Sequence, residues 1–248
     1  MEVHKHPHHV THKKKWTEFL LEFFMLFLAV FLGFVAENIR EHQVEKHREK
    51  QYMKSMLEDL KKDQVGIEWA IKRRLQALTK SDSLISLLTT SSDSSGLIYY
   101  YARRVAGRAD FRPTTGGFEQ LKSAGGLRLI YPQVADSIST YYKVINIIQK
   151  LEELEDHQQE DIQEMFSELF DTKVFISMAS RESYIITRPL GKPKLLSYDQ
   201  KVINKFCMKL HFWQIKSTLI YRLFLFSLKP KGENLINLIQ KKYHLQNE

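Results

Sequence analysis

The sequence predicts an all-α protein in which one N-terminal transmembrane helix continues into a long stalk helix and is followed by an antiparallel helical bundle domain. Three observations predict this class. Residues 19–36 form an almost unbroken apolar run, residues 37–65 contain no glycine or proline, and apolar residues recur at helical spacing from Met53 to Leu78. An apolar run of this length is typical of a membrane span, and recurrence every three or four residues is typical of a helix that packs against others.

The apolar run is long enough to cross a bilayer. From Trp16 to Ala36 the chain has 21 residues, and at about 1.5 Å per residue they span roughly 32 Å, close to the hydrocarbon thickness of about 30 Å. A buried helix of a soluble protein is one alternative, and a cleaved signal peptide is another. Phe34 stands where a cleavage site needs a small residue, and apolar side chains surround the helix instead of forming one stripe. We therefore expect an uncleaved transmembrane signal-anchor over residues 16–36.

The basic residues predict how this anchor is oriented. Lys and Arg are almost equally numerous on the two sides of the span, but Lys13, Lys14 and Lys15 directly abut it. Because basic residues close to a span tend to stay in the cytoplasm, we expect a single-pass protein of the bacterial inner membrane with a cytoplasmic N-terminus and a periplasmic C-terminal domain. The opposite orientation stays open. The tail, residues 1–15, is basic and His-rich without the fixed spacing of a metal site, so no metal is predicted.

Two carboxylates lie within the predicted span. Glu18 and Glu22 are four residues apart and share one helix face near the entry side. In one interpretation Glu18 lies at the level of the lipid headgroups, pairs with Lys14, and Glu22 reaches toward the same level. In the other interpretation Glu22 marks an intramembrane contact with a second helix, because carboxylates inside a membrane are costly and are usually paired.

The composition limits the domain size, the partners and the disulfides that are possible in the remainder of the chain. Beyond the span, about 200 residues are left, enough for one domain with a substantial core. The formal net charge is +8, and Lys and Glu are interleaved along the predicted helices. This pattern indicates a solvated surface and no nucleic-acid partner. Cys207 is the single cysteine, so an internal disulfide is excluded and we expect a small buried side chain there.

Apolar spacing, glycine and proline together predict the order of the helices. A stalk helix over residues 37–90 is expected to pack into a helical bundle domain over residues 91–248, partly in the manner of a coiled coil. The predicted elements of that domain are a short helix over 97–106, a helix capped by Thr114 or Thr115 and ended by the glycine pair Gly125–Gly126, a long helix from Pro132 to about Phe170, a helix over 198–228 and a last helix that begins at Pro230.

Two segments resemble a known family. Met56–Asp63 matches a run of the form LLxDLKxD, and Thr115–Ile130 matches T-G-x-[FY]-E-x-L-K-S-x-G-x-L-R-L-I, with Gly116 and Gly117 before Phe118. Together with the juxtamembrane block they resemble a family of single-span, uncharacterised membrane proteins abundant in Bacteroidota. The resemblance covers the first two-thirds of the chain well and the last third loosely. It implies the membrane anchor, the helical domain and the outward orientation, and it adds no catalytic residue.

The sequence lacks the motifs of common catalytic chemistry: a Gly-rich phosphate loop, HExxH, a Cys pair and GxSxG. We therefore predict no catalytic, cofactor-binding or metal-binding residue. One basic and aromatic constellation comprises Tyr100, Arg104, Arg108 and Arg128. If the glycine-flanked helix folds against the first short helix, these arginines surround an anion such as a carboxylate or a phosphate. In the alternative, the tyrosines pack and the arginines face water or helix C-terminal carbonyls.

These observations predict a membrane-anchored, non-enzymatic helical module without a cofactor, which binds a protein partner or a small ligand on the outer side of the inner membrane. The alternative is a self-associating structural scaffold subunit of an envelope complex, in which the anchor and the stalk form a homo-oligomer. The lipid bilayer is a partner in both hypotheses.

Overall fold

The structure is a computed structural model that describes residues 16–90, 95–105, 107, 110–179 and 185–245. The chain divides into two compact units, Met1–Lys50 and Gln51–Glu248. The described residues are mainly helical, and the one pairing of extended backbone among them is an isolated antiparallel bridge between Ala179 and Ile186. The predicted all-α class is confirmed. The His-rich tail lies outside the described residues.

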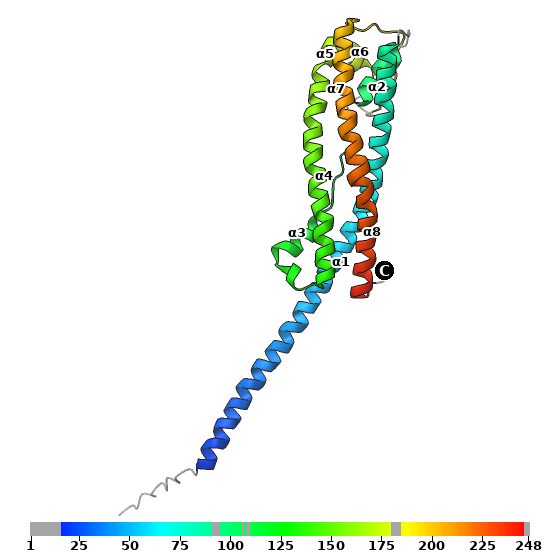
Figure 1. Cartoon of the computed structure of the whole chain (residues 1–248). Coiled ribbons are helices and arrows are strands. Elements are labelled where there is room, and N and C mark those ends of the chain that lie inside the picture. The colour runs from blue at the N-terminus through cyan, green and yellow to red at the C-terminus, as the bar shows by residue number, and fades with distance from the viewer. Residues whose placement is uncertain (1–15, 91–94, 106, 108–109, 180–184, 246–248) are drawn as a thin grey trace, which may run out of the picture. The chain divides into compact units, whose positions relative to one another are not determined.

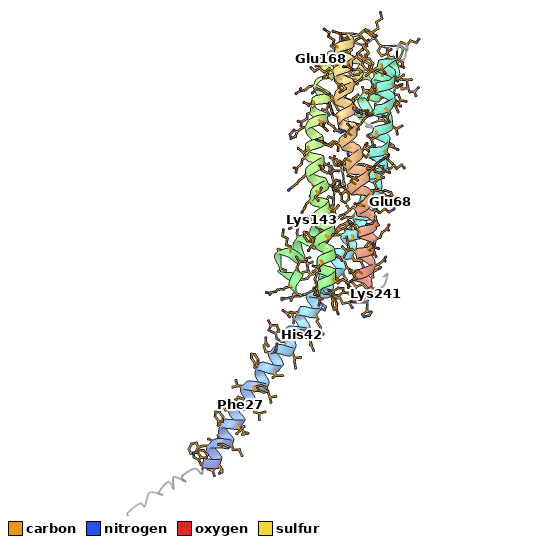
Figure 2. The ribbon with its side chains drawn as sticks, in the orientation of Figure 1. Phe27, His42, Glu68, Lys143, Glu168 and Lys241 are labelled. Atoms are coloured by element: carbon orange, nitrogen blue, oxygen red, sulfur yellow. The ribbon has the colours of Figure 1, made fainter. Side chains whose placement is uncertain are left out.

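Helix α1 (Trp16–Thr89) begins with the apolar run and continues into the second unit without a break. Among the described helices, it is the one that is long and apolar enough, by length and composition, to cross a membrane. Side chains in its first part are exposed, as Figure 2 shows around Phe27. Phe23, Phe27 and Phe31 stack along one face, with ring centroids 6.3 Å and 6.0 Å apart. The helix required for a span is therefore present, while the crossing itself stays a prediction.

Three long helical rods make up the Gln51–Glu248 unit (Figure 1). The first rod is the later part of α1, and the second is α4 (Pro132–Glu164). The third rod is continuous from α7 (Gln200–Leu219) through the π-helical η2 (Ile220–Leu225) into α8 (Phe226–Tyr243). Helix α4 contacts α7, η2 and α8 along its length.

The three rods do not simply alternate in direction. Asp63 and Arg74 of α1 bond to Tyr141 and Glu152 of α4, so residue numbers rise together along α1 and α4 and the two helices run the same way. The third rod runs opposite to both: residues Lys209 and Lys216 of α7 contact Asp161 and Leu154 of α4, respectively. The predicted antiparallel packing thus describes α7–α8 against the other rods, and it does not describe α1 against α4.

The connection between α1 and α4 explains their common direction. After α2 (Ser95–Val105), the chain returns along α1: the Phe111 ring packs against Gly66, and the Thr114 N–H donates to Asp63. The short helices α3 (Gly116–Ser123) and η1 (Gly126–Arg128) complete the return before Pro132, which opens α4 as predicted. Because the chain has travelled back along α1 first, α4 repeats the direction of α1.

Two hydrophobic clusters fill the space between the rods. The first joins the two ends of the unit's sequence and includes Met56, Leu60, Ile67, Tyr141, Ile145, Leu228 and Ile239. The second includes Leu84, Tyr99, Phe170, Phe206, Cys207 and Trp213. The predicted buried position of Cys207 is confirmed, and burial raises the pKa of its thiol to about 11.

On α1, the buried face departs from the predicted apolar stripe after Ile67. The predicted recurrence from Met53 to Leu78 includes Ile71 and Leu75, whereas the structure buries Ala70 and Arg74 and leaves Leu75 40% exposed. Burying Arg74 places a charged group in the interior, and its partners on the other two rods fix the rotation of α1 about its own axis. Hydrophobicity alone therefore gave the wrong register for this segment.

The helix boundaries differ from the prediction at two places. Helix α4 ends at Glu164, and two short helices, α5 (Phe166–Leu169) and α6 (Thr172–Ser177), follow it. A new helix was predicted to begin at Pro230, but α8 continues through that residue. Proline cannot donate to the carbonyl four residues earlier, and the π-helical turn of η2 ends just before that position. The wide π-helical turn therefore accommodates the hydrogen bond that Pro230 cannot make, and the helix continues through this residue.

Two carboxylates of α1 hold α3 in place. The Gly117 N–H donates to Asp59 Oδ2 at 2.6 Å, and the Thr114 N–H donates to Asp63 Oδ1 at 2.7 Å. Thr115 is the N-cap residue of α3, but its side chain makes no cap hydrogen bond, so Asp59 from another helix caps α3 instead. The two segments that carry the family resemblance are therefore in direct contact. At the other end of α3, Gly125 has φ 63°, the left-handed conformation that is typical of a glycine that ends a helix, so the predicted helix end at the glycine pair is confirmed.

The close approach of α3 to α1 gives a stability prediction. A Cβ at Gly117 would lie 3.0 Å from Asp59 Oδ2 and from the Met56 amide nitrogen, whereas a Cβ at Gly116 would lie 3.8 Å from Asp59 Oδ2. We expect Gly117→Ala to lower the free energy of unfolding by about 1–3 kcal/mol, because backbone atoms cannot move aside easily. Gly116→Ala, the matched control, should be neutral or slightly stabilising. Thermal unfolding followed by circular dichroism tests this, and equal melting temperatures for the two variants would contradict it.

Candidate anion-binding site

The structure brings together two of the four residues predicted to bind an anion. Tyr100 and Arg104 both lie on α2, and the guanidinium carbon of Arg104 is 4.8 Å from the ring centroid of Tyr100. Arg108 lies outside the described residues. Arg128 is an exposed residue of η1, and it does not join the other two.

The position of Arg128 follows from the path of the chain. The neighbouring Gly126 packs against Tyr52 of α1, while Arg104 lines a pocket with Ala77 of α1. Positions 52 and 77 are 25 residues apart on one helix, which corresponds to roughly 37 Å at about 1.5 Å per residue. The glycine-flanked helix thus folds against the other end of the unit from α2, so the predicted ring of arginines does not include Arg128.

A small cationic pocket surrounds Arg104. Its volume is about 110 Å³, and its lining comprises Arg73, Gln76, Ala77, Lys80, Arg103, Arg104, Gly107 and Ile186. Four of these residues are basic, and none of the described lining residues carries a carboxylate. Arg73, Gln76 or Ala77, and Lys80 fall on one face of α1 because they are three or four residues apart. The pocket therefore forms where this face meets the end of α2 and the segment around Ile186.

Arg104 is held in the pocket by backbone and by an aromatic ring. Its Nη2 donates to the carbonyl oxygen of Ile186 at 3.2 Å. The bridge between Ala179 and Ile186, together with the bond from the Thr187 N–H to the Met178 carbonyl at 2.9 Å, fixes this carbonyl. The Nε atom of Arg104 is buried and has no hydrogen-bond partner among the described residues. An N–H donor in this situation is costly unless a ligand or water accepts its hydrogen bond.

The other arginines near the pocket lie over aromatic rings. Arg103 is 5.6 Å from the ring centroid of Phe175, Arg188 is 5.6 Å from that of Tyr100, and Arg73 is 5.3 Å from that of Trp69. A cation over a ring face is stabilised by the ring quadrupole without using its N–H donors. The rings thus position these guanidinium groups without occupying their forked N–H donors.

The electrostatics of the pocket favour a negative ligand. The pKa of Lys80 lies below its usual value because burial disfavours the ammonium, and because Arg104 and Arg73 repel it. A bound anion would compensate for both causes. A pocket of about 110 Å³ has room for a compact group such as a phosphate or a carboxylate, since about 10–15 Å³ of such space already admits one water molecule. Arginine fits both groups because its forked donors match their oxygen pairs.

A second polar cluster lies at the centre of the unit. Arg74 is 2% exposed, and its Nη1 donates to Glu155 Oε1 at 2.7 Å and to Ser217 Oγ at 2.9 Å, while its Nη2 donates to Glu152 Oε1 at 3.1 Å. The Phe111 N–H donates to the same Glu152 oxygen at 3.0 Å. None of these five residues lines any of the described pockets. This cluster joins α1, α4, α7 and the returning segment, so its role is structural.

The other two predicted site residues lie in the predicted membrane anchor. Glu18 and Glu22 lie on the first part of α1 and are exposed in the chain by itself, and their contact with a second helix stays a prediction. Within the described residues no group of three or more His, Cys, Asp or Glu side chains is placed to hold a metal ion.

Sequence reasoning found Arg104 and Tyr100 but missed Arg73 and Lys80. Both lie on α1, where they appeared as ordinary members of an exposed charged face. The sequence carries no periodic signal for them, because their position follows from the burial of Arg74. Once Arg74 is known to point inward, the helix rotation places the 73–80 face beside it, toward the element that covers α1.

Comparison of the chain with family models, with curated proteins and with solved structures finds no match.

The central cluster gives a pH prediction. Burial raises the pKa of Glu152 to about 7, although the Phe111 N–H and Arg74 oppose the shift. Between its usual pKa of about 4.5 and about 7, the folded protein holds a proton on Glu152 that the unfolded chain has released. The stability that this proton contributes is therefore complete below about pH 4.5 and is lost as the pH rises to about 7. Glu152→Gln cannot titrate, so the stability of the wild type relative to this variant should fall over that window, by on the order of 3 kcal/mol.

Denaturant unfolding of both proteins from pH 4 to pH 9 measures this difference. A difference that is constant across the window would contradict the assignment of the proton to Glu152. Glu164→Gln, an exposed position on the same helix, is the matched control and should show no such dependence.

Proposed function

We propose that this protein is a membrane-anchored, non-enzymatic helical module that binds a small anionic ligand through the pocket around Arg104. One observation carries the proposal: Arg73, Lys80, Arg103 and Arg104 converge on a pocket whose described lining contains no carboxylate. Placing four cations together is unfavourable unless an anion joins them. The ligand class is a molecule that presents a phosphate or a carboxylate group.

The anchor and its orientation are part of this proposal. The exposed apolar first part of α1 supports a span at residues 16–36, and the basic triplet before the span supports a cytoplasmic N-terminus. In this arrangement the helical domain meets ligands and partners on the outer side of the bacterial inner membrane. The resemblance to single-span membrane proteins of Bacteroidota agrees with this orientation.

The ligand prediction is tested with inorganic phosphate and acetate on the full chain in detergent micelles, at constant ionic strength adjusted with chloride. A ligand that binds the folded state raises the melting temperature as its concentration passes the dissociation constant. We expect at least one of the two anions to stabilise the wild type, and Arg104→Gln to weaken that binding by about tenfold or more, because a charge-assisted hydrogen bond contributes about 1.5–3 kcal/mol.

The matched control is Arg128→Gln, which removes an arginine from η1, away from the pocket, and should bind the anion as the wild type does. Lys80→Gln is the second pocket variant, for use if Arg104→Gln lowers the stability of the free protein. Equal anion responses in the wild type and in both pocket variants would refute the site.

The topology prediction is tested by fusing a reporter that is active only after export behind Glu248, and separately one that is active only in the cytoplasm. We expect activity from the exported reporter alone. As a control, replacing Lys13, Lys14 and Lys15 with Gln should weaken or reverse the preference, because these residues hold the tail inside. Activity of the cytoplasmic reporter alone in the unmodified chain would place the domain, and its ligand, in the cytoplasm.

A further inference from the structure

A second hollow lies beside the cationic pocket, on the same part of α1. Its volume is about 560 Å³, and its lining comprises Val65, Gly66 and Trp69 of α1 together with Asp110 and Arg112 of the segment that follows α2. We call it the Trp69 groove. Trp69 is 52% exposed, so part of a large aromatic ring is open to a ligand in this groove.

The Trp69 groove and the cationic pocket share one face of α1. Five lining residues of the two hollows follow one another at intervals of three or four positions: Gly66, Trp69, Arg73, Ala77 and Lys80. Residues at such intervals lie on one side of a helix. The chain after α2 also borders both hollows, through Gly107 at the pocket and Arg112 at the groove. The two hollows are therefore formed between the same two segments.

Arg73 connects the two hollows. It lines the cationic pocket, and its guanidinium carbon is 5.3 Å from the ring centroid of Trp69, which lines the groove. The ring holds this guanidinium through its quadrupole and leaves the N–H donors of Arg73 for an anion. A ligand whose anionic group pairs with Arg73 therefore has its adjoining atoms within reach of Trp69.

The sizes of the hollows indicate how a ligand divides between them. Pockets for small molecules usually measure about 300–1,000 Å³. The cationic pocket, at about 110 Å³, is smaller than this, whereas the Trp69 groove, at about 560 Å³, falls within the range. An apolar cavity of about 150 Å³ holds benzene, so the groove has room for one or two fused rings. The pocket thus takes the anionic group, and the groove takes the larger remainder.

The charge of the Trp69 groove favours a neutral remainder. Its two charged lining residues, Asp110 and Arg112, have opposite signs, whereas the described lining of the cationic pocket has four basic residues and no carboxylate. A second anionic group is therefore not favoured in the groove. Val65 and Trp69 supply apolar surface, and a flat ring stacks well on an indole.

Another groove also borders the cationic pocket, at Gln76. It lies between α1 and the third rod, its volume is about 760 Å³, and Leu75 and Phe226 are among its lining residues. Its described lining includes two carboxylates, Glu68 and Glu233, and includes none of the arginines of the pocket. The contact between Arg73 and Trp69 has no counterpart in that lining. It therefore selects the Trp69 groove.

We propose that the Trp69 groove binds a neutral aromatic ring of the same ligand whose phosphate or carboxylate group occupies the pocket around Arg104. The inference rests on the proposed anion site and narrows its ligand class to aromatic phosphate esters or aromatic carboxylates. Trp69 determines the specificity for the ring, and Arg73 pairs with the anionic group.

The test compares two ligands that share one anionic group. Adenosine monophosphate and ribose 5-phosphate have the same phosphate and pentose, and only the former has a base. Both are titrated into the full chain in detergent micelles at constant ionic strength, with the melting temperature as the readout. We expect adenosine monophosphate to bind about fivefold or more tightly than ribose 5-phosphate, because a base stacks favourably on an aromatic side chain. If acetate is the anion that binds, 4-phenylbutyrate and butyrate form the equivalent pair.

Variants of the ring assign this preference to the groove. Trp69→Leu should bind both ligands equally and should bind ribose 5-phosphate as the wild type does, whereas Trp69→Phe, which retains a ring, should keep part of the preference. The matched control is Phe226→Leu, which removes an aromatic ring that is 65% exposed from the other groove. This variant should keep the full preference.

Two results would overturn the aromatic site and leave the anion site intact. One is equal binding of the two ligands by the wild type. The other is a preference that survives in Trp69→Leu, and its loss in Phe226→Leu would place the ring in the groove beside the third rod. If neither ligand pair, nor inorganic phosphate, nor acetate stabilises the wild type, the anion site itself fails and the aromatic site fails with it. The two failures are therefore distinguishable.

Discussion

The buried charge of Arg74 is the constraint on which the rest of the helical domain depends. A guanidinium that is 2% exposed is tolerated only where its charge is paired, because an unpaired buried charge costs several kcal/mol. The Nη1 and Nη2 atoms of Arg74 carry the ion pairs, while its Nε is buried without a hydrogen-bond partner among the described residues. Its partners come from α4 and α7, and the Phe111 amide joins the same network through Glu152. The cluster therefore fixes the relative register of the three rods, since sliding or rotating any of them would leave a charge without a partner. The apolar clusters on either side are less specific, because hydrophobic contacts tolerate small shifts.

The orientation of α1 that Arg74 imposes also creates the cationic pocket. With Arg74 inward, Arg73 and Lys80 lie on a face that meets α2. Arg104 then approaches from α2, held by the Ile186 carbonyl and by Tyr100. A structural ion cluster and a candidate binding site thus share one helix segment but have opposite charge balance. The cluster pairs its cation with two carboxylates, whereas the described lining of the pocket offers cations without any. This contrast is the reason to assign structure to the first and ligand binding to the second.

The third rod and the pocket are built from different elements of the same domain. The third rod packs on α4 with one face and leaves the opposite face apolar. This rod also contains the π-helical turn and Pro230. The turn changes the angular positions of the residues that follow, and Phe226 lies beside Ile71 and Leu75 of α1 on the rim of a groove. Exposed apolar side chains therefore continue from Met208 in α7 through Leu223 in η2 to Phe226 in α8.

The sequence by itself determined the helical class, the apolar run of α1, the start of α4 at Pro132 and the glycine end of α3, because local periodicity and backbone preference decide these features. It also singled out Tyr100 and Arg104 as a pair, since they are neighbours on one helix. Only the tertiary structure decided that α1 and α4 run in the same direction, that Asp59 caps α3, that Arg128 lies far from Arg104, and that Arg73 and Lys80 join the pocket. Each of these depends on which residues far apart in the chain meet. That choice is made by the pairing of a few buried polar groups, Arg74 with Glu152 and Glu155 above all, and such pairings leave no periodic trace in the sequence.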